Sequence, residues 1–388
     1  MPKLVRITTI PASMMVLLKG QMKFMHEKGF DVTMISSKGA EVSQLIKQEG
    51  CPHIAVKLTR KISPLTDIIS LLKLTILLRK IKPDVVHTHT PKAGLIGMWA
   101  AKLAGVKIRF HTIAGLPWVE SKGFIRHLLV TVEKLTAYAA TAVYPNSFVQ
   151  RDFLLTNGIA KSKLKVIGNG SSNGIDTDYF SLSDEITKQA EQIKNQLRVN
   201  GNSWIWIFVG RIVKDKGITE LIDAFIDFQT QFPDDKLLLL GDQEPDLDPL
   251  DEKYMNLLKT HPAIQCCGFQ KDIRPYLAAS KVLVFPSYRE GFPNVPMQAG
   301  SMGCALILSD INGCNEIVKH GENGWLVPVK NANEISKAMK GARNNPELVN
   351  NFAKSIQQKI KMNYSQKILW DLLLAEYSIQ ISKINSSK

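Results

Sequence analysis

Two loops of this chain combine charged side chains with strand and helix signals in a way that could bind a polar ligand. Arg211 and Lys216 follow one apolar, strand-like run, and Glu290 follows a second at residues 282–287. The segment after Glu290 carries glycine and proline, and then the small residues of a helix start. A helix N-terminus offers free backbone N–H groups to an anion, and a loop carboxylate can hold sugar hydroxyls. These loops therefore predict a site for a polar ligand.

The elements that must position these loops alternate between strand and helix. In the first half, strands are expected at residues 4–10, 31–36, 54–56, 83–89, 107–111, 142–146 and 164–167, and helices at 13–28, 40–49, 64–81, 92–103, 123–139 and 147–157. In the second half, strands are expected at 204–209, 236–241, 264–268, 281–285 and 305–308, with helices that include 219–231 and 272–279 and a wholly helical chain after 329. Such alternation indicates parallel pairing by right-handed crossovers, so we predict an α/β fold with doubly wound parallel sheets.

The length of 388 residues favours two domains over a single core. We assign residues 1–180 to an N-terminal domain and 204–363 to a C-terminal domain, with 181–203 as a polar linker that contains some helix. The segment 364–388 has Trp370 and Tyr377 on one helical face and is expected to return to the N-terminal domain. Two such domains are expected to face across a cleft at the carboxyl ends of their strands, where open α/β sheets bind ligands.

The charge of the chain is unevenly distributed. The formal net charge is +14, and residues 1–180 hold 25 Lys and Arg against 11 Asp and Glu, so the excess lies entirely in the first half. Either this is a solvated basic face, or that half meets an anionic partner such as membrane lipid, a phosphorylated substrate or nucleic acid. No apolar run approaches the roughly 20 residues of a membrane span. Five cysteines without a C-x-x-C pair support neither a disulfide framework nor a zinc site, which fits a reducing cytoplasm.

Several motifs in matching order carry a resemblance over essentially the whole length. They are Phe110-His111-Thr112, Asn173-Gly174-Ile175-Asp176, Gly210-Arg211 with Lys216-Gly217, and the Glu290 loop. With these motifs the chain resembles family 4 of the retaining glycosyltransferases, which have the GT-B fold of two Rossmann-like domains. The segment 86–94 further resembles bacterial members that build capsule, O-antigen or lipid-linked oligosaccharides. The loop at residues 8–13 lacks the glycine pair common in the family, at which the backbone approaches the donor phosphate closely.

The resemblance implies roles for the charged loop residues. Arg211 and Lys216 are expected to stabilise the departing diphosphate of a nucleotide-sugar donor without a metal ion. Glu290 is expected at the donor sugar. The family has a second carboxylate at the ribose, and this chain has Gln298 there, so ribose binding is expected to be retained but weaker.

Further positions are carried over from the same resemblance. Donor contacts are expected from backbone groups at Gly210, Gly291, Phe292, Asn294 and Val295. His111 is expected just past a strand, in the cleft, as a hydrogen-bonding catalytic residue beside the sugar and phosphate. His89 and Lys92, at a helix start, are candidates for binding an acceptor phosphate, whereas His87 is expected to point into the sheet.

The leading hypothesis is a metal-independent retaining glycosyltransferase without a cofactor. It would move a sugar from a UDP-sugar to a polyprenyl-diphosphate-linked saccharide for capsule, O-antigen or exopolysaccharide. The protein would be cytoplasmic and would associate peripherally with the inner face of the plasma membrane through its basic half. A nucleotide-sugar 2-epimerase of the same fold is the enzyme alternative, and an inactive sugar-binding relative stays open. A nucleic-acid binder is disfavoured because no helix-turn-helix, zinc-finger or aromatic RNA-binding signature occurs.

Two segments bear on membrane contact. The expected helix 64–81 is apolar nearly all round, with Arg60, Lys61, Arg79 and Lys82 beside it. Such a helix is either buried or in contact with lipid, and burial against the first sheet is slightly preferred. The segment 118–127 is the second candidate for membrane contact.

Overall fold

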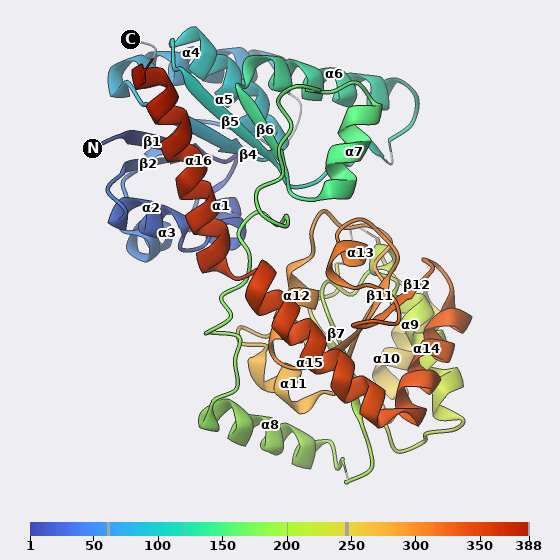
Figure 1. Cartoon of the computed structure of the whole chain (residues 1–388). Coiled ribbons are helices and arrows are strands. Elements are labelled where there is room, and N and C mark those ends of the chain that lie inside the picture. The colour runs from blue at the N-terminus through green and yellow to red at the C-terminus, as the bar shows by residue number, and fades with distance from the viewer. Residues whose placement is uncertain (60–62, 120, 200, 245–247, 387–388) are drawn as a thin grey trace. The chain divides into compact units, whose positions relative to one another are not determined.

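The fold was determined from a computed structural model, which describes residues 1–59, 63–119, 121–199, 201–244 and 248–386. The chain forms two compact units (Figure 1). The first comprises Met1–Gly174 together with Gln366–Lys388, and the second comprises Ile175–Ser365. Each unit contains one six-stranded sheet in which every pair of strands is parallel. The predicted fold class, α/β with two doubly wound parallel sheets, is confirmed.

The first unit has its sheet between two layers of helices. Its strands are β1 (Lys3–Ile7), β2 (Asp31–Ser36), β3 (His53–Ala55), β4 (Val85–His89), β5 (Ile108–Ile113) and β6 (Ala142–Pro145). Its helices are α1 (Pro11–Leu17), α2 (Gln21–Glu27), α3 (Val42–Glu49), α4 (Pro64–Ile81), α5 (Pro91–Leu103), the short 3₁₀ turn η1 (Pro117–Val119), α6 (Gly123–Ala139), α7 (Phe148–Thr156) and α16 (Gln366–Ser386). Helices α4 to α6 cover one face, and α1 to α3 with α16 cover the other, so each face has its own apolar core (Figure 1).

The second unit repeats this architecture. Its strands are β7 (Ile205–Val209), β8 (Lys236–Leu240), β9 (Ile264–Cys266), β10 (Val282–Phe285), β11 (Ala305–Ser309) and β12 (Trp325–Val327). Its helices are α8 (Asp184–Gln196), the 3₁₀ turn η2 (Lys214–Lys216), α9 (Ile218–Gln229), α10 (Glu252–Thr260), α11 (Arg274–Ala279), α12 (Asn294–Ser301), α13 (Cys314–Ile317), α14 (Ala332–Asn344) and α15 (Pro346–Asn363). The central strands β7, β10 and β11 are buried along their whole length, as parallel strands covered on both faces require.

Both sheets have the same strand order, and this order defines where a ligand can bind. The first sheet runs β3-β2-β1-β4-β5-β6, and the second runs β9-β8-β7-β10-β11-β12 when counted in the same direction. The connections therefore reverse direction between β1 and β4, and between β7 and β10. Loops that leave the two strands of such a switch point diverge and open a crevice at the carboxyl edge of the sheet.

Three expected elements differ from those observed. The helix expected at 13–28 is two helices, because Gly20 has a left-handed φ of +81° and a Cβ there would meet the ring of Trp370. The strand expected at 164–167 is reduced to a single bridge between Val143 and Leu164. The segment 181–203 was expected to be a linker with some helix; it contains α8, which packs on α11, and it belongs to the second unit.

Candidate functional site

The charged loop residues lie at the switch point of the second sheet. Gly210 and Arg211 directly follow β7, and the short turn η2 ends at Lys216. Ser287 and Glu290 follow β10, the neighbour of β7 in the sheet. Because parallel strands end at the same edge, the two loops lie next to each other although they are far apart in sequence.

Lys216 and Glu290 meet directly between these two loops. The Lys216 Nζ lies 2.6 Å from the Glu290 Oε1, and the two side chains are 14% and 18% exposed. Ser287 connects them, since its hydroxyl donates to the Glu290 Oε1 at 2.9 Å and the Lys216 Nζ lies 3.4 Å from the same hydroxyl. An ammonium group, a carboxylate and a hydroxyl are thus held together, close to solvent but largely screened from it. Ser287 was not among the predicted site residues, although its position directly after a buried strand was an available signal.

The backbone between Lys216 and α9 fixes this contact. Gly217 has φ = +70°, and a Cβ on it would overlap the carbonyl oxygen of Pro286 at the end of β10. Only glycine lets the two loops approach this closely. On the other side of β7, a Cβ on Gly241 would overlap the carbonyl oxygen of Gly210. The chain segment that carries the cations is therefore held between the ends of β8 and β10.

Arg211 is placed differently from Lys216. Its side chain is 44% exposed and its Nη1 donates to the Glu244 Oε2 at 2.9 Å. Its Nη2 lies 3.9 Å from the Asp215 Oδ2, which also accepts from Arg289 at 3.2 Å. The other Asp215 oxygen, Oδ1, is buried and has no hydrogen-bond partner among the described residues. Arg211 therefore stands at the exposed rim of the site, in exchangeable pairs with carboxylates.

The helix α12 brings backbone N–H groups to the same edge. Pro293 precedes its first turn, so Asn294 and Val295 begin the helix, and Phe292 is buried just before it. Gln298 follows one turn later and is partly exposed. The loop before the helix is held by Asn312, a residue missed in the sequence, which donates to the carbonyl oxygen of Gly291 at 2.6 Å.

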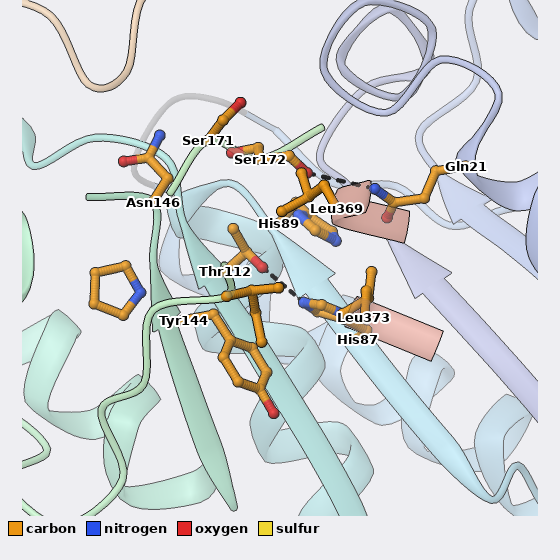
Figure 2. A pocket seen from close by; sticks show the side chains of 12 residues that line it. Gln21, His87, His89, Thr112, Tyr144, Asn146, Ser171, Ser172, Leu369 and Leu373 are labelled. Carbon is orange, nitrogen blue, oxygen red and sulfur yellow. Dashed lines mark hydrogen bonds between the residues drawn. The ribbon is translucent and has the colours of Figure 1, made fainter. Parts of the chain in front are cut away.

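A separate polar pocket lies at the carboxyl edge of the first sheet (Figure 2). Its volume of about 20 Å³ suits a water molecule or the end of a small polar group. His89, at the end of β4, and Asn146, just after β6, are buried in its wall. The His89 Nε2, the Asn146 Oδ1 and the Ser172 Oγ are buried atoms that lack a hydrogen-bond partner within the described ranges. The pocket thus presents unpaired polar atoms from three chain segments.

The floor of this pocket is a buried network centred on Arg6. Its guanidinium group contacts the His87 Nδ1 at 3.1 Å, and it also donates to Tyr377 of α16 and to Gln21 of α2. The His87 Nε2 lies 2.7 Å from the Thr112 hydroxyl. Burial lowers the pKa of both His87 and His89 well below the usual histidine value, with the Arg6 charge adding to the effect, so both rings are neutral at pH 7. His87 was expected to point into the sheet, and its buried ring lies in this network on one face of the sheet.

His111 does not lie where the sequence analysis placed it. It lies within β5 rather than past its end, and only 2% of it is exposed. Its ring lies on the opposite face of the sheet from the pocket, under Gly94 of α5, and its Nδ1 is 2.8 Å from the Thr88 hydroxyl. The Glu133 Oε1 of α6 lies 4.0 Å from its Nε2. Burial lowers the pKa of His111 to about 4 and raises the pKa of Glu133 to about 7.

Lys92 is also engaged elsewhere. It is in the first turn of α5, and its Nζ lies 2.5 Å from the Asp67 Oδ2 of α4, with both side chains mostly buried. This pair connects the first turns of α4 and α5. Lys92 therefore lacks the open position expected of a phosphate ligand.

No group of three or more His, Cys, Asp or Glu side chains is arranged to hold a metal ion in the part of the chain that the structure describes. None of the helices within the described ranges has the length and apolar character needed to cross a membrane.

Two family profiles match this chain, and the boundary between them falls where the two units of the fold meet in the sequence. A family profile described as "Glycosyl transferase 4-like domain" matches residues 18–170, and one described as "Glycosyl transferases group 1" matches residues 189–359. The chain is 32% identical over 378 residues to the capsular polysaccharide biosynthesis glycosyltransferase CapM of Staphylococcus aureus, with 97% of each protein covered. It is 28% identical over 335 residues to the UDP-Gal:alpha-D-GlcNAc-diphosphoundecaprenol alpha-1,3-galactosyltransferase of Escherichia coli, with 85% of this chain and 84% of that protein covered.

Solved structures show the same fold at lower sequence identity. HepE from Anabaena in complex with UDP and glucose has a TM-score of 0.81 and 19% identity, and covers 97% of this chain and 100% of its own. Sucrose-phosphate synthase from Thermosynechococcus elongatus has a TM-score of 0.78 and 20% identity, and covers 99% and 100%. At these identities the likeness establishes the architecture.

Proposed function

Because this chain belongs to the glycosyltransferases that combine a glycosyl transferase 4-like domain with a group 1 domain, we propose that it transfers a sugar from a UDP-sugar to a polyprenyl-diphosphate-linked saccharide. The product would be capsule, O-antigen or a related polysaccharide. The Lys216–Glu290 contact at the switch point of the second sheet carries the proposal, since it joins a cation for a phosphate to a carboxylate for sugar hydroxyls. The names of the E. coli and S. aureus relatives support the choice of donor, acceptor and pathway. These similarities do not favour the epimerase alternative.

In the proposed donor site each side chain has a distinct role. Lys216 and Arg211 hold the diphosphate, Arg211 by exchanging its exposed contact with Glu244 for a phosphate oxygen. Glu290 accepts hydrogen bonds from the sugar, and Gln298 bonds to the ribose. Backbone N–H groups at the start of α12, around Phe292, Asn294 and Val295, bind the phosphate or the sugar. Gly210 and Gly291 let the backbone approach the ligand without a side chain in the way.

The proposed reaction retains the configuration at the sugar and uses no metal. The acceptor hydroxyl attacks the anomeric carbon on the face from which the diphosphate leaves. The bond from that carbon to the phosphate oxygen breaks, the new bond to the acceptor oxygen forms, and the hydroxyl proton passes to the departing phosphate. Two cations stabilise the negative charge that develops on the diphosphate. Full turnover in the presence of EDTA is expected, and a requirement for Mg²⁺ or Mn²⁺ would reject this part of the proposal.

For the acceptor, we assign the pocket around His89 in the first unit. Its unpaired atoms at His89, Asn146 and Ser172 suit a hydroxyl-bearing group of the saccharide. Lys92 contributes to the proposed acceptor site only indirectly, through its ion pair with Asp67. Replacing Ser172→Ala removes a hydroxyl that has no partner within the described ranges, so the fold should be unaffected. We expect a several-fold higher KM for the acceptor and an unchanged affinity for the donor. An unchanged acceptor KM would reject the assignment.

The proposed site of action is the cytoplasmic face of the plasma membrane, where the basic first half would meet anionic lipid.

The proposed direct contact of His111 with the donor would require its ring to leave the buried position under Gly94. A His111→Asn variant should therefore change stability more than donor affinity. If it weakens donor binding without a change in melting temperature, the catalytic role predicted for His111 is supported.

A two-step experiment tests the whole proposal. First, nucleotide-sugars are screened for thermal stabilisation, since a ligand that binds the folded protein raises its melting temperature by mass action. We expect UDP and one UDP-sugar to stabilise the protein. Second, UDP release is measured with and without a polyprenyl-diphosphate-linked disaccharide. Release that depends on the acceptor supports transfer, whereas conversion of the nucleotide-sugar without any acceptor would reject it.

A further inference from the structure

Helix α4 presents a stripe of aliphatic side chains to solvent as well as packing others on the protein. Five of them are between 53% and 80% exposed: Leu65, Ile68, Ile69, Leu72 and Ile76. Their spacing of three or four residues places them in one stripe along the helix. The buried face of the same helix includes Ser70 and Thr75 beside Leu74 and Leu78. The outer face of α4 therefore carries an apolar stripe of its own, in addition to the face that packs on the sheet, where Leu71, Leu77 and Ile81 join the core.

The polar residues of the buried face explain how this arrangement is stable. The Ser70 hydroxyl donates to the carbonyl oxygen of Thr66 at 2.8 Å, and the Thr75 hydroxyl donates to that of Leu71 at 2.7 Å. Both hydroxyls are satisfied within the helix and need no water. No comparable reason exists for the exposed aliphatic stripe, because exposed apolar surface gains nothing from contact with water.

A second group of exposed apolar residues lies on α6 in the same helix layer. Phe124 and Ile125, in its first turn, are 81% and 60% exposed. Helices α4, α5 and α6 pack side by side on one face of the first sheet (Figure 1). The Lys92–Asp67 pair joins the starts of α4 and α5. Because each of these helices follows a parallel strand, each begins at the carboxyl edge of the sheet, which is also the edge that carries the His89 pocket.

Basic side chains outnumber carboxylates in this helix layer. Helices α4, α5 and α6 contain seven Lys and Arg residues and two carboxylates, Asp67 and Glu133. Asp67 is paired with Lys92, and Glu133 is buried. Lys73, Arg79 and Lys80 are exposed on α4, beside the apolar stripe. An apolar face surrounded by cations suits a bilayer with anionic lipids, because the lysine and arginine stems can lie along the acyl boundary while their charges reach the headgroups. A second copy of the chain would instead bring like charges together.

We propose that the outer faces of α4 and the start of α6, here called the α4–α6 face, dock on an anionic bilayer and insert their aliphatic and aromatic side chains. The choice of lipid as the partner rests on the proposed function, in which the acceptor is held in a membrane. Docking of this face holds the first unit beside the bilayer that carries the acceptor, with the His89 pocket on the other face of the sheet. The Arg60 and Lys61 expected to flank the helix lie outside the described residues.

Vesicle binding by the full-length protein tests the proposal. The variant Ile68→Ser, Leu72→Ser, Ile76→Ser is compared with the wild type in co-sedimentation with vesicles of phosphatidylglycerol and phosphatidylcholine. We expect the variant's partition coefficient to fall by about tenfold or more, because three largely exposed apolar groups are lost from the bilayer. The matched control Phe269→Ser, Met362→Ser changes two exposed apolar residues of the second unit and should bind like the wild type. Wild-type binding should also fall with added salt and with vesicles of phosphatidylcholine alone.

The remaining outcomes are equally decisive. Equal vesicle binding by the triple variant and the wild type overturns the proposal, and so does a wild-type dimer that the triple variant abolishes. Transfer to an acceptor with a short, water-soluble lipid should be unchanged in the triple variant, and an equal loss there would assign the face to folding or catalysis instead. If the wild type binds vesicles through this face but transfers no sugar to any acceptor, the proposed function fails while the docking face stands.

Discussion

The Nζ of Lys216 and the Oε1 of Glu290 lie 2.6 Å apart although 74 residues separate them in the sequence. The contact exists because β7 and β10 are neighbours at the switch point of their sheet. It also has a consequence for ligand binding. The ion pair holds both side chains in position before the donor arrives. When the donor binds, the lysine shares its charge between the carboxylate and the incoming phosphate.

The first prediction concerns the cation of this pair. Lys216→Ala should lower kcat/KM by about 10²–10³-fold, the effect of removing one preorganised group that stabilises developing charge, or about 3–4 kcal/mol. Lys214→Ala is the matched control, because Lys214 is in the same turn but its ammonium is paired with Asp251 at 2.7 Å. The control should retain close to full activity. Similar losses in both variants would show that the turn itself, rather than the Lys216 charge, is what matters.

The second prediction concerns the glycine that follows. Gly217→Ala should destabilise the second unit by at least about 3 kcal/mol, because a left-handed φ and an overlap with the Pro286 carbonyl act together. Gly268→Ala is the control, since Gly268 also has a left-handed φ of +62° but no atom within 4 Å of the added Cβ. It should cost about 1–2 kcal/mol. Urea unfolding of both variants separates the two effects, and equal costs would mean that the close approach to β10 is unimportant.

Much of this site could be predicted because its determinants are local. The central strands are continuous apolar runs, and the loops after β7 and β10 carry charges and glycines at the strand ends, so a site at their carboxyl edge followed from the pattern. Features that depend on distant partners could not be predicted. The need for glycine at position 20 depends on Trp370, and the engagement of Lys92 depends on Asp67.

The error at His111 has a simple physical origin. Sequence placed the end of the strand at residue 111, whereas β5 continues to Ile113. Side chains alternate between the faces of a strand, so a small error in its end changes which side chain is available at the edge. As a result Thr112 lines the pocket, and His111 is buried on the other face. For α4, an all-round apolar pattern could not indicate which stripe would face the sheet.

The third prediction concerns the residue that departs from the family pattern. Gln298→Glu places a carboxylate where the ribose hydroxyls are proposed to bind, and charge-assisted hydrogen bonds are roughly twice as strong as neutral ones. We expect the Kd for UDP to fall about five- to tenfold, measured by calorimetry. Gln231→Glu adds the same charge at an exposed position after α9 and should leave the Kd unchanged. Weaker UDP binding by Gln298→Glu would indicate that this position lies near the diphosphate rather than the ribose.

The fourth prediction concerns the buried pair His111 and Glu133. Burial raises the pKa of Glu133 from its ordinary 4.5 to about 7, so the protein loses stability as pH rises through this interval and the buried carboxyl ionises. His111 cannot compensate as a cation there, because burial lowers its pKa to about 4.

Glu133→Gln removes the ionisation but keeps the shape of the side chain. Its melting temperature should therefore match that of the wild type near pH 4.5, exceed it increasingly up to pH 7, and stay higher by a constant amount above that. The full difference corresponds to about 3 kcal/mol, from about 1.4 kcal/mol per pKa unit. Lys134→Gln, at the adjacent exposed position of α6, should show no such pH dependence. A melting-temperature difference between Glu133→Gln and wild type that is flat from pH 4.5 to 8 would mean that Glu133 ionises normally, through solvent access or an ion pair with His111.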